Sequence, residues 1–132
     1  MTNKISINTH KQISNSLCGT PIKTEENYSL VELELTEKMR TDESNLIHGG
    51  FTFGMADYAA MIAVNHPNVV LASSNVSFVK PTVVGDILVA EAKVIENNGK
   101  KKKVSVEVKC MDDIVFKGEF LCVVPEKHVL DK

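Results

Sequence analysis

One apolar run constrains the fold of this chain more than any other feature. From Phe51 to Val64 almost every residue is apolar or small, which is enough for a helix of about four turns. A helix that is apolar all round must be buried, because no face is left to meet water. The run is too short to span a bilayer, so we expect its burial to be inside protein. Asp57 is its only charged residue, and a lone carboxylate in an apolar setting is costly unless something pairs or hydrates it.

The segments on either side of this run alternate apolar and polar residues, as β-strands do. Residues 28–37 place Val31, Leu33 and Leu35 on one face and polar residues on the other, which predicts a strand with one buried face. The further strands predicted after the apolar run are 69–79, 87–95, 104–110 and 114–124.

Turn residues separate the predicted elements. Pro67 biases the residue before it away from helical angles, so the helix should end near Asn65. The triplets Asn97-Asn98-Gly99 and Met111-Asp112-Asp113 predict tight turns between antiparallel neighbours. Residues 39–46 are polar and predict a loop that leads into the helix.

This order of elements predicts an α+β domain. Short connections favour antiparallel pairing of neighbouring strands, and the apolar helix is the one segment able to cover the buried face of the sheet. We therefore expect one domain over residues 1–132, in which a curved antiparallel sheet wraps around one long central helix. Its polar N-terminal segment, about residues 1–20, has room for a short helix over 9–17, and the tail from about 125 is expected to fray.

Composition excludes several classes of function. A formal net charge of −2 gives no electrostatic case for nucleic acid or an anionic membrane as a partner. The three cysteines have no disulfide-framework spacing, and no secretory signal is visible, so we expect a cytoplasmic protein. His10, His66 and His128 lie in polar or terminal stretches without metal-ligand spacing, and no metal is predicted.

The layout resembles the hotdog fold, and within it the thioesterases of the phenylacetate-degradation (PaaI-like) branch. The residues that carry the resemblance are His48-Gly49-Gly50 at the start of the helix and Asp57, nine positions after the histidine. A strand that leads to Pro81, the pair Gly85-Asp86 and a strand with small residues then follow in the family's order. The resemblance extends from residue 28 to residue 124 and implies the hotdog fold.

The resemblance also implies a reaction. In the family, a thioester carbonyl is activated by the amide of the glycine after the histidine, here Gly49, and a carboxylate, here Asp57, acts as general base or nucleophile. His48 would polarise the carbonyl or brace the loop, and Gly50 would lie beside the substrate. The implied substrate is an acyl-CoA or acyl-carrier-protein thioester, with coenzyme A as part of the ligand and no other cofactor. Family sites lie between subunits, which implies a homodimer or a dimer of dimers (a homotetramer).

Three residues depart from the family pattern. The family often has asparagine six residues before the histidine and glycine three before it, where this chain has Asp42 and Asn45. Met61 lies one turn after Asp57, where some relatives carry a hydroxyl group. We expect these three residues near the substrate, and a carboxylate at residue 42 close to Asp57 would raise the pKa of one of the two.

Two functions therefore stay open: an acyl thioester hydrolase, and a non-catalytic hotdog domain that binds acyl-CoA or a related ligand as a sensor or accessory protein. Asp57 favours the first, and the three departures favour the second. Asn75, on a polar strand face, is the preferred ligand contact of its strand, although exposed polar alternation explains it equally well. The lysine run 100–103 predicts a solvated, edge-protecting surface, with coenzyme A phosphates as the alternative.

Overall fold

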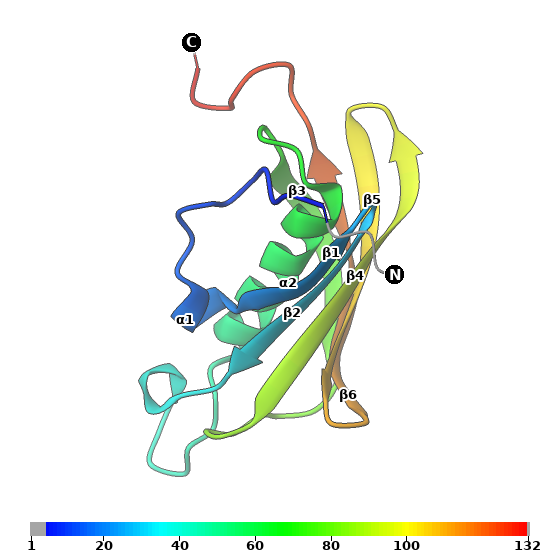
Figure 1. Cartoon of the computed structure of the whole chain (residues 1–132). Helices are drawn as coiled ribbons and strands as arrows, with labels where there is room; N and C mark the ends of the chain where they lie inside the picture. The colour runs from blue at the N-terminus through cyan, green and yellow to red at the C-terminus, as the bar shows by residue number, and fades with distance from the viewer. Residues whose placement is uncertain (1–4, 132) are drawn as a thin grey trace.

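The computed structural model describes residues 5–131 (Figure 1). The helical elements are α1 (Asn15–Cys18), the 3-10 turn η1 (Glu37–Met39) and α2 (Gly49–Val64). The strands are β1 (Thr20–Glu25), β2 (Tyr28–Glu34), β3 (Val70–Phe78), β4 (Ile87–Asn98), β5 (Lys101–Cys110) and β6 (Asp113–Val123).

The strands form one six-stranded sheet in the order β1-β2-β4-β5-β6-β3, in which all neighbours are antiparallel. The sheet curves around α2, and the N-terminal segment with α1 lies on the other side of the helix (Figure 1). The predicted α+β architecture, a curved antiparallel sheet around one long helix, is therefore confirmed.

The core lies between α2 and the concave face of the sheet. Alternate residues of the central strands point at the helix, and those of β4 and β5 are Leu88, Ala90, Ala92, Val104, Val106 and Val108, each 0% exposed. The facing turns of the helix carry small residues such as Ala59, Ala60 and Ala63, which let the strands approach closely. One polar contact lies inside this core, where the Ser29 hydroxyl donates to the carbonyl of Ala59 at 2.6 Å.

The ends of α2 are set by local backbone chemistry. The helix begins at Gly49, two residues before the predicted start. It ends as predicted at Asn65, whose left-handed backbone (φ 56°) lets its N–H bond the carbonyl of Met61. The Asn65 side chain also accepts from the N–H of Asn8 and donates to the carbonyl of Ser6, so the N-terminal segment is tied to this end of the helix.

Two predictions near the N-terminus were wrong in detail. The predicted helix over 9–17 is reduced to α1, the four residues Asn15–Cys18. Residues 20–25, which no prediction assigned to a strand, form β1 at the edge of the sheet. An edge strand tolerates Pro21 because one row of its backbone groups needs no partner strand.

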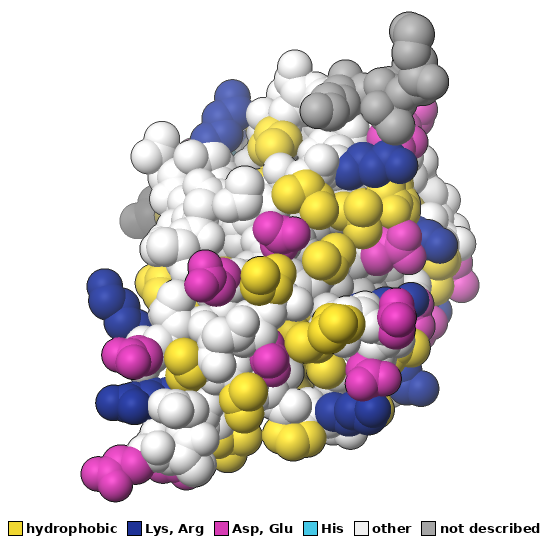
Figure 2. All heavy atoms as spheres, turned by 60° about the horizontal axis from the view of Figure 1, so that its bottom comes forward, with side chains coloured by type: hydrophobic (Ala, Val, Ile, Leu, Met, Phe, Trp, Pro, Cys, Tyr) yellow, Lys and Arg dark blue, Asp and Glu magenta, His cyan; other side chains and the backbone are white. Residues whose placement is uncertain are grey.

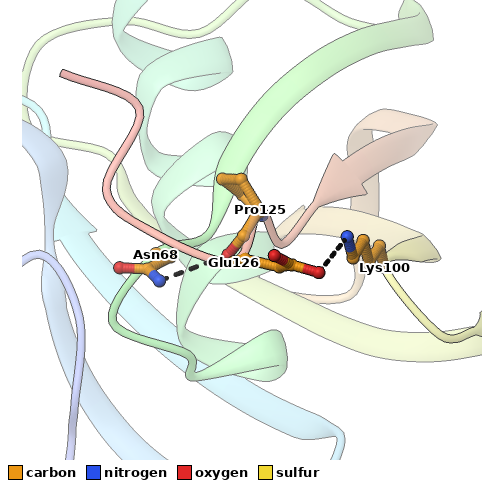
Figure 3. A network of polar contacts seen from close by, with 4 residues as sticks. All are labelled: Asn68, Lys100, Pro125 and Glu126. Atoms are coloured by element: carbon orange, nitrogen blue, oxygen red, sulfur yellow. Dashed lines mark hydrogen bonds and ion pairs between the residues drawn. The ribbon is translucent and has the colours of Figure 1, made fainter. Parts of the chain in front are cut away.

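The chain after β6 is held to the domain at its first residues (Figure 3). The Val124 N–H donates to the Lys100 carbonyl at 2.7 Å, Asn68 donates to the Pro125 carbonyl at 3.2 Å, and Lys100 pairs with Glu126 at 3.0 Å.

No helix among residues 5–131 combines the length and the apolarity that a membrane crossing would need.

Candidate functional site

The first turn of α2 presents free backbone amides at one end of the molecule. His48 occupies the N-cap position in extended conformation, and its side chain does not cap the helix. Within the described residues no acceptor bonds the N–H of Gly49 or of Gly50. Free amides and the helix dipole both favour negative charge at such an end, so a polarised carbonyl oxygen would be stabilised there.

Close neighbours, and not unusual backbone angles, leave little room for a side chain at either glycine. A Cβ on Gly49 would lie 3.0 Å from Cε1 of Phe78, and one on Gly50 would lie 2.9 Å from Nε2 of His48. The Phe78 ring and the His48 imidazole therefore rest directly on the first turn of the helix. The Phe51 ring lies next to the His48 imidazole in an edge-to-face arrangement, with ring centroids 6.1 Å apart.

A cleft of about 350 Å³ opens beside Gly49. Its lining residues come from the start of α2 and the residue Ile47 before it, from the end of β3 and the connection after it, and from β6; they are Ile47, Gly49, Thr52, Phe78, Val79, Lys80, Pro81, Thr82 and Val115. Figure 2, in which this end of the molecule comes forward, shows apolar side chains spread among charges of both signs. Phe78 and Val79, which line the cleft, are 57% and 46% exposed.

Asp57 lies further along the same helix and is held without a partner. Its Oδ1 atom is buried, and no described residue donates to it. Burial raises the pKa of this carboxyl to about 6, so that it gains and loses a proton close to neutral pH. A Cβ on Gly54, one turn before it, would meet nothing within 4 Å, so there is open space beside the helix at Gly54.

Neighbouring thiols do not compete for the role of nucleophile. Burial, followed by the charge of Asp57, raises the pKa of Cys18 and raises that of Cys122 to about 12. Thiols with raised pKa values stay protonated at neutral pH and are poor nucleophiles.

Among residues 5–131 no group of three or more His, Cys, Asp or Glu side chains could hold a metal ion. Asp57 is thus the titratable group best suited to chemistry in this region.

Asp42 and Asn45 shape the loop before the helix. The Asp42 carboxylate accepts from the hydroxyl and the N–H of Ser44 at 2.5 and 3.0 Å, and these bonds lower its pKa. Burial accounts for the raised pKa of Asp57, and the structure shows no effect of Asp42 on it. Asn45 has a left-handed backbone (φ 69°), and its side chain accepts from Arg40 at 3.0 Å. This backbone explains why either glycine or asparagine suits the position.

Met61 and Asn75 lie apart from the cleft in a single chain. Met61 is 1% exposed and packs in the core, so its side chain offers no surface to a ligand. Asn75 pairs with Glu119 across β3 and β6, on the face of the sheet that points away from α2. The sequence brings Asp57, Gly49, His48 and Gly50 onto one helix, whereas these two side chains are directed elsewhere.

The lysine run belongs mostly to β5, at the far end of the sheet from Gly49. Lys100 pairs with Glu126, Lys102 donates to Asn97, and Lys103 pairs with Glu96 at 3.6 Å. These contacts agree with a solvated charge run along a hairpin.

Phe78 and the cleft next to it are the features that the sequence did not reveal. The alternation of β3 places Phe78 on the same face as Val76, but nothing local indicates that its ring reaches the start of α2. That contact depends on how the sheet curves. A half-exposed aromatic residue at the end of an edge strand, close to a proline, is the one signal that could have suggested it.

Comparisons with known proteins agree with the fold described above. The family described as Thioesterase superfamily matches residues 44–117. The solved structure of an uncharacterized protein, PH1136 from Pyrococcus horikoshii, is 55% identical and superposes with a TM-score of 0.96, covering 97% of this chain and 98% of that one. Smu.793 from Streptococcus mutans UA159, solved bound to acetyl CoA, has a TM-score of 0.79 at 21% identity over 89% of this chain and 97% of that one. That last similarity shows the fold alone.

Two curated relatives are longer than this chain. A methylthioribose-1-phosphate isomerase from Aquifex aeolicus (strain VF5) is 52% identical over 90% of this chain and 26% of that protein. A transcription factor FapR from Caldanaerobacter subterraneus subsp. tengcongensis is 32% identical over 75% of this chain and 50% of that protein. This chain therefore spans about a quarter and about half of the length of these two relatives.

Proposed function

The chain belongs to the thioesterase superfamily, and from this premise we propose that it hydrolyses acyl-CoA or acyl-carrier-protein thioesters at a site formed by two copies of the chain. The observation that carries the proposal is the pairing of two features on one helix. Unbonded amides stand at the start of α2, and a buried carboxylate oxygen without a partner lies further along it. The finer assignment to the phenylacetate-degradation branch is part of the same proposal.

The proposed reaction uses each of these groups once. The thioester carbonyl accepts a hydrogen bond from the Gly49 N–H, which stabilises the negative charge that develops on its oxygen. Ionised Asp57 takes a proton from a water molecule as that water attacks the carbonyl carbon. The tetrahedral intermediate then collapses, the C–S bond breaks, and the proton passes from Asp57 to the leaving thiol. Coenzyme A enters only as part of the ligand.

The length of α2 favours the use of a second copy. Asp57 follows Gly49 by eight residues of continuous helix, which is a rise of about 12 Å. A base that acts on the carbonyl through one water molecule must lie close to it, so this separation favours a Gly49 and an Asp57 that come from different chains. A two-fold pairing would bring Gly49 of one copy toward Asp57 of the other. The free edge of β3, which pairs only with β6, supports such self-association.

The second function is binding of an acyl-CoA without hydrolysis. It is favoured by the relationship to a transcription factor, FapR, and by Asp42 and Asn45 where the family often has an amide and a glycine. Smu.793, which shares the fold, was solved bound to acetyl CoA, so an acyl-CoA is the ligand to test in either case. We also propose a cytoplasmic location, in keeping with the three free cysteines of the described residues.

A panel of acyl-CoA thioesters tests both functions in one experiment. Release of free thiol measures hydrolysis, and calorimetry with the same compounds measures binding. Hydrolysis of one or more thioesters supports the enzyme, whereas binding without hydrolysis of any supports the sensor. The absence of both binding and hydrolysis across the panel would contradict the two proposals together.

A further inference from the structure

We infer that the cleft beside Gly49 is the acyl subsite of the site proposed above, and that it takes an uncharged, apolar acyl group of up to about ten carbons. This inference rests on the proposed function, because it assumes that the carbonyl of the ligand lies at the start of α2. It adds the class of acyl group, which family membership leaves open.

The position of the cleft supports this assignment. Gly49 itself is part of the lining, so a carbonyl bonded to its N–H has its substituent at the mouth of the cleft. The Phe78 ring forms one wall, in contact with Gly49, and packs edge-to-face on Phe116 at 5.1 Å between centroids. A half-exposed phenylalanine leaves apolar area in water, and an apolar acyl group would cover it.

The chemistry of the lining selects against charge. Among the residues that line the cleft, Lys80 is the only charged one, and its ammonium group already pairs with Asp113 at 3.5 Å. The other polar side chains are the hydroxyls of Thr52 and Thr82, in residues only 4% and 5% exposed. A free carboxylate on the acyl group would lose its water and would have to compete with Asp113 for the ammonium group of Lys80, which is unfavourable.

The size of the cleft limits the length of the acyl group. Its volume is about 350 Å³, and a water-sized group occupies roughly 30 Å³, which is room for about twelve such groups and, because a flexible chain does not fill a cleft completely, for about ten carbons. The floor is closed by Ile47 and Val115, which are 5% and 4% exposed and belong to the core. A longer chain would therefore extend into water beyond the cleft.

Binding to a series of straight-chain acyl-CoAs tests the inference. Calorimetry on the full-length Asp57→Asn variant keeps the ligands intact during the measurement. Each methylene buried in the cleft should raise affinity about fourfold, up to about ten carbons, and further methylenes should add little. Affinity that does not change with chain length would overturn the inference. So would a dicarboxylic acyl-CoA that binds as tightly as a straight-chain one of equal length.

Two matched valines give the control. Val79 lines the cleft and is 46% exposed, whereas Val83 lies outside it and is 45% exposed. Val79→Trp should lower affinity for decanoyl-CoA at least tenfold and leave acetyl-CoA within about twofold, because only the longer chain fills the cleft. Val83→Trp should leave both ligands within about twofold. Equal losses for acetyl-CoA, decanoyl-CoA and free coenzyme A in Val79→Trp would assign the cleft to the pantetheine arm and overturn the inference.

A second variant keeps the test open if Val79→Trp misfolds. Phe78→Ala removes the half-exposed ring that forms one wall of the cleft. In this variant, affinity should continue to rise to longer acyl chains before it levels off. An unchanged chain-length profile would contradict the inference. Failure of the proposed function looks different: wild type would hydrolyse nothing while the binding profile still rises and levels off. Hydrolysis that is indifferent to chain length would uphold the function and overturn the acyl subsite.

Discussion

Asp57 is a partly buried carboxylate whose Oδ1 atom is shielded from water and has no hydrogen-bond partner among residues 5–131. If it serves as general base, Asp57→Asn preserves shape but removes the proton acceptor, and turnover should fall by roughly two to four orders of magnitude. Binding of acyl-CoA should change far less, because most of the ligand surface would be contacted by residues other than Asp57. Thiol release and calorimetry on the same preparations measure the two effects. A folded variant that keeps most of the wild-type rate would show that Asp57 is not the base.

The pH dependence of the same reaction follows from the pKa of about 6. Below that pH the carboxyl is protonated and cannot accept a proton, so kcat/KM of wild type should fall as pH drops through about 6. The residual activity of Asp57→Asn should not show this fall at low pH. If kcat/KM falls identically in both proteins, the titrating group is not Asp57.

The same residue makes a prediction about stability. Its carboxyl binds a proton more tightly in the folded chain, at a pKa of about 6, than in the unfolded chain, near 3.8. Stability is therefore lost as pH rises from about 4 to about 6, and the cost persists above that range. Asp57→Asn should raise the free energy of unfolding at pH 7.5 by about 1–3 kcal/mol and leave it nearly unchanged at pH 4. Denaturant titrations at the two pH values measure the difference, and a variant less stable at pH 7.5 would contradict it.

The setting of a single residue can be predicted where the residue differs from all its neighbours. That Asp57 is a carboxylate inside a buried helix could be predicted, because it is the one charge in an apolar run. The surroundings of Asp42 could not, since they depend on Ser44 two residues later and on the shape of the loop. The interior position of Met61 follows from the rotation of the helix against the sheet, which the all-round apolar pattern of the run does not specify.

Among the elements, α2 was the most predictable, because an apolar run of that length has few alternatives to a buried helix. The strands after it were predicted by their period of two. β1 was missed because an edge strand can be polar and can contain a proline such as Pro21. The cleft is a property of several elements together, since Gly49, Phe78 and Val115 meet only in the folded chain.

The start of α2 permits a substitution that removes a single amide. His48 has φ −65° and ψ 128°, the conformation that a residue before proline prefers, and proline suits the first position of a helix. Gly49→Pro should therefore fold and yet lack the proposed oxyanion donor, with turnover lowered by about two to three orders of magnitude. Gly49→Ala is the matched control, because it adds a Cβ against Phe78 but keeps the N–H.

Thiol release measured on both variants decides the role of the amide. Gly49→Ala should lose less activity than Gly49→Pro, since its loss comes only from crowding by the Phe78 ring. Circular dichroism checks that both variants retain the fold. Equal activity in the two would show that the N–H of Gly49 does not contact the reacting carbonyl.

At the scale of the whole molecule, the two halves of the proposed site are separated by about 12 Å of helix, so we expect the proposed function to depend on assembly. Sedimentation at micromolar concentration should give a dimer of about 29 kDa or a multiple of it, twice the 14.5 kDa of the chain. The sequence implied a dimer only through family resemblance. The length and continuity of α2 add a physical argument in its favour, and the dimer stays a prediction.

Mixing two inactive variants tests whether each site is shared between copies. Gly49→Pro and Asp57→Asn should each abolish both sites of their own dimers. In a mixed dimer, intact Gly49 from one chain faces intact Asp57 from the other, which restores one site of two. When equal amounts of the two variants are unfolded and refolded together, half of the dimers that form contain one chain of each variant. The rate of the mixture should therefore recover to about a quarter of the wild-type rate. The control is the same mixture combined without unfolding, which should stay inactive while subunits do not exchange. If a refolded mixture that contains mixed dimers shows no recovery, then Gly49 and Asp57 do not serve one site across the two chains.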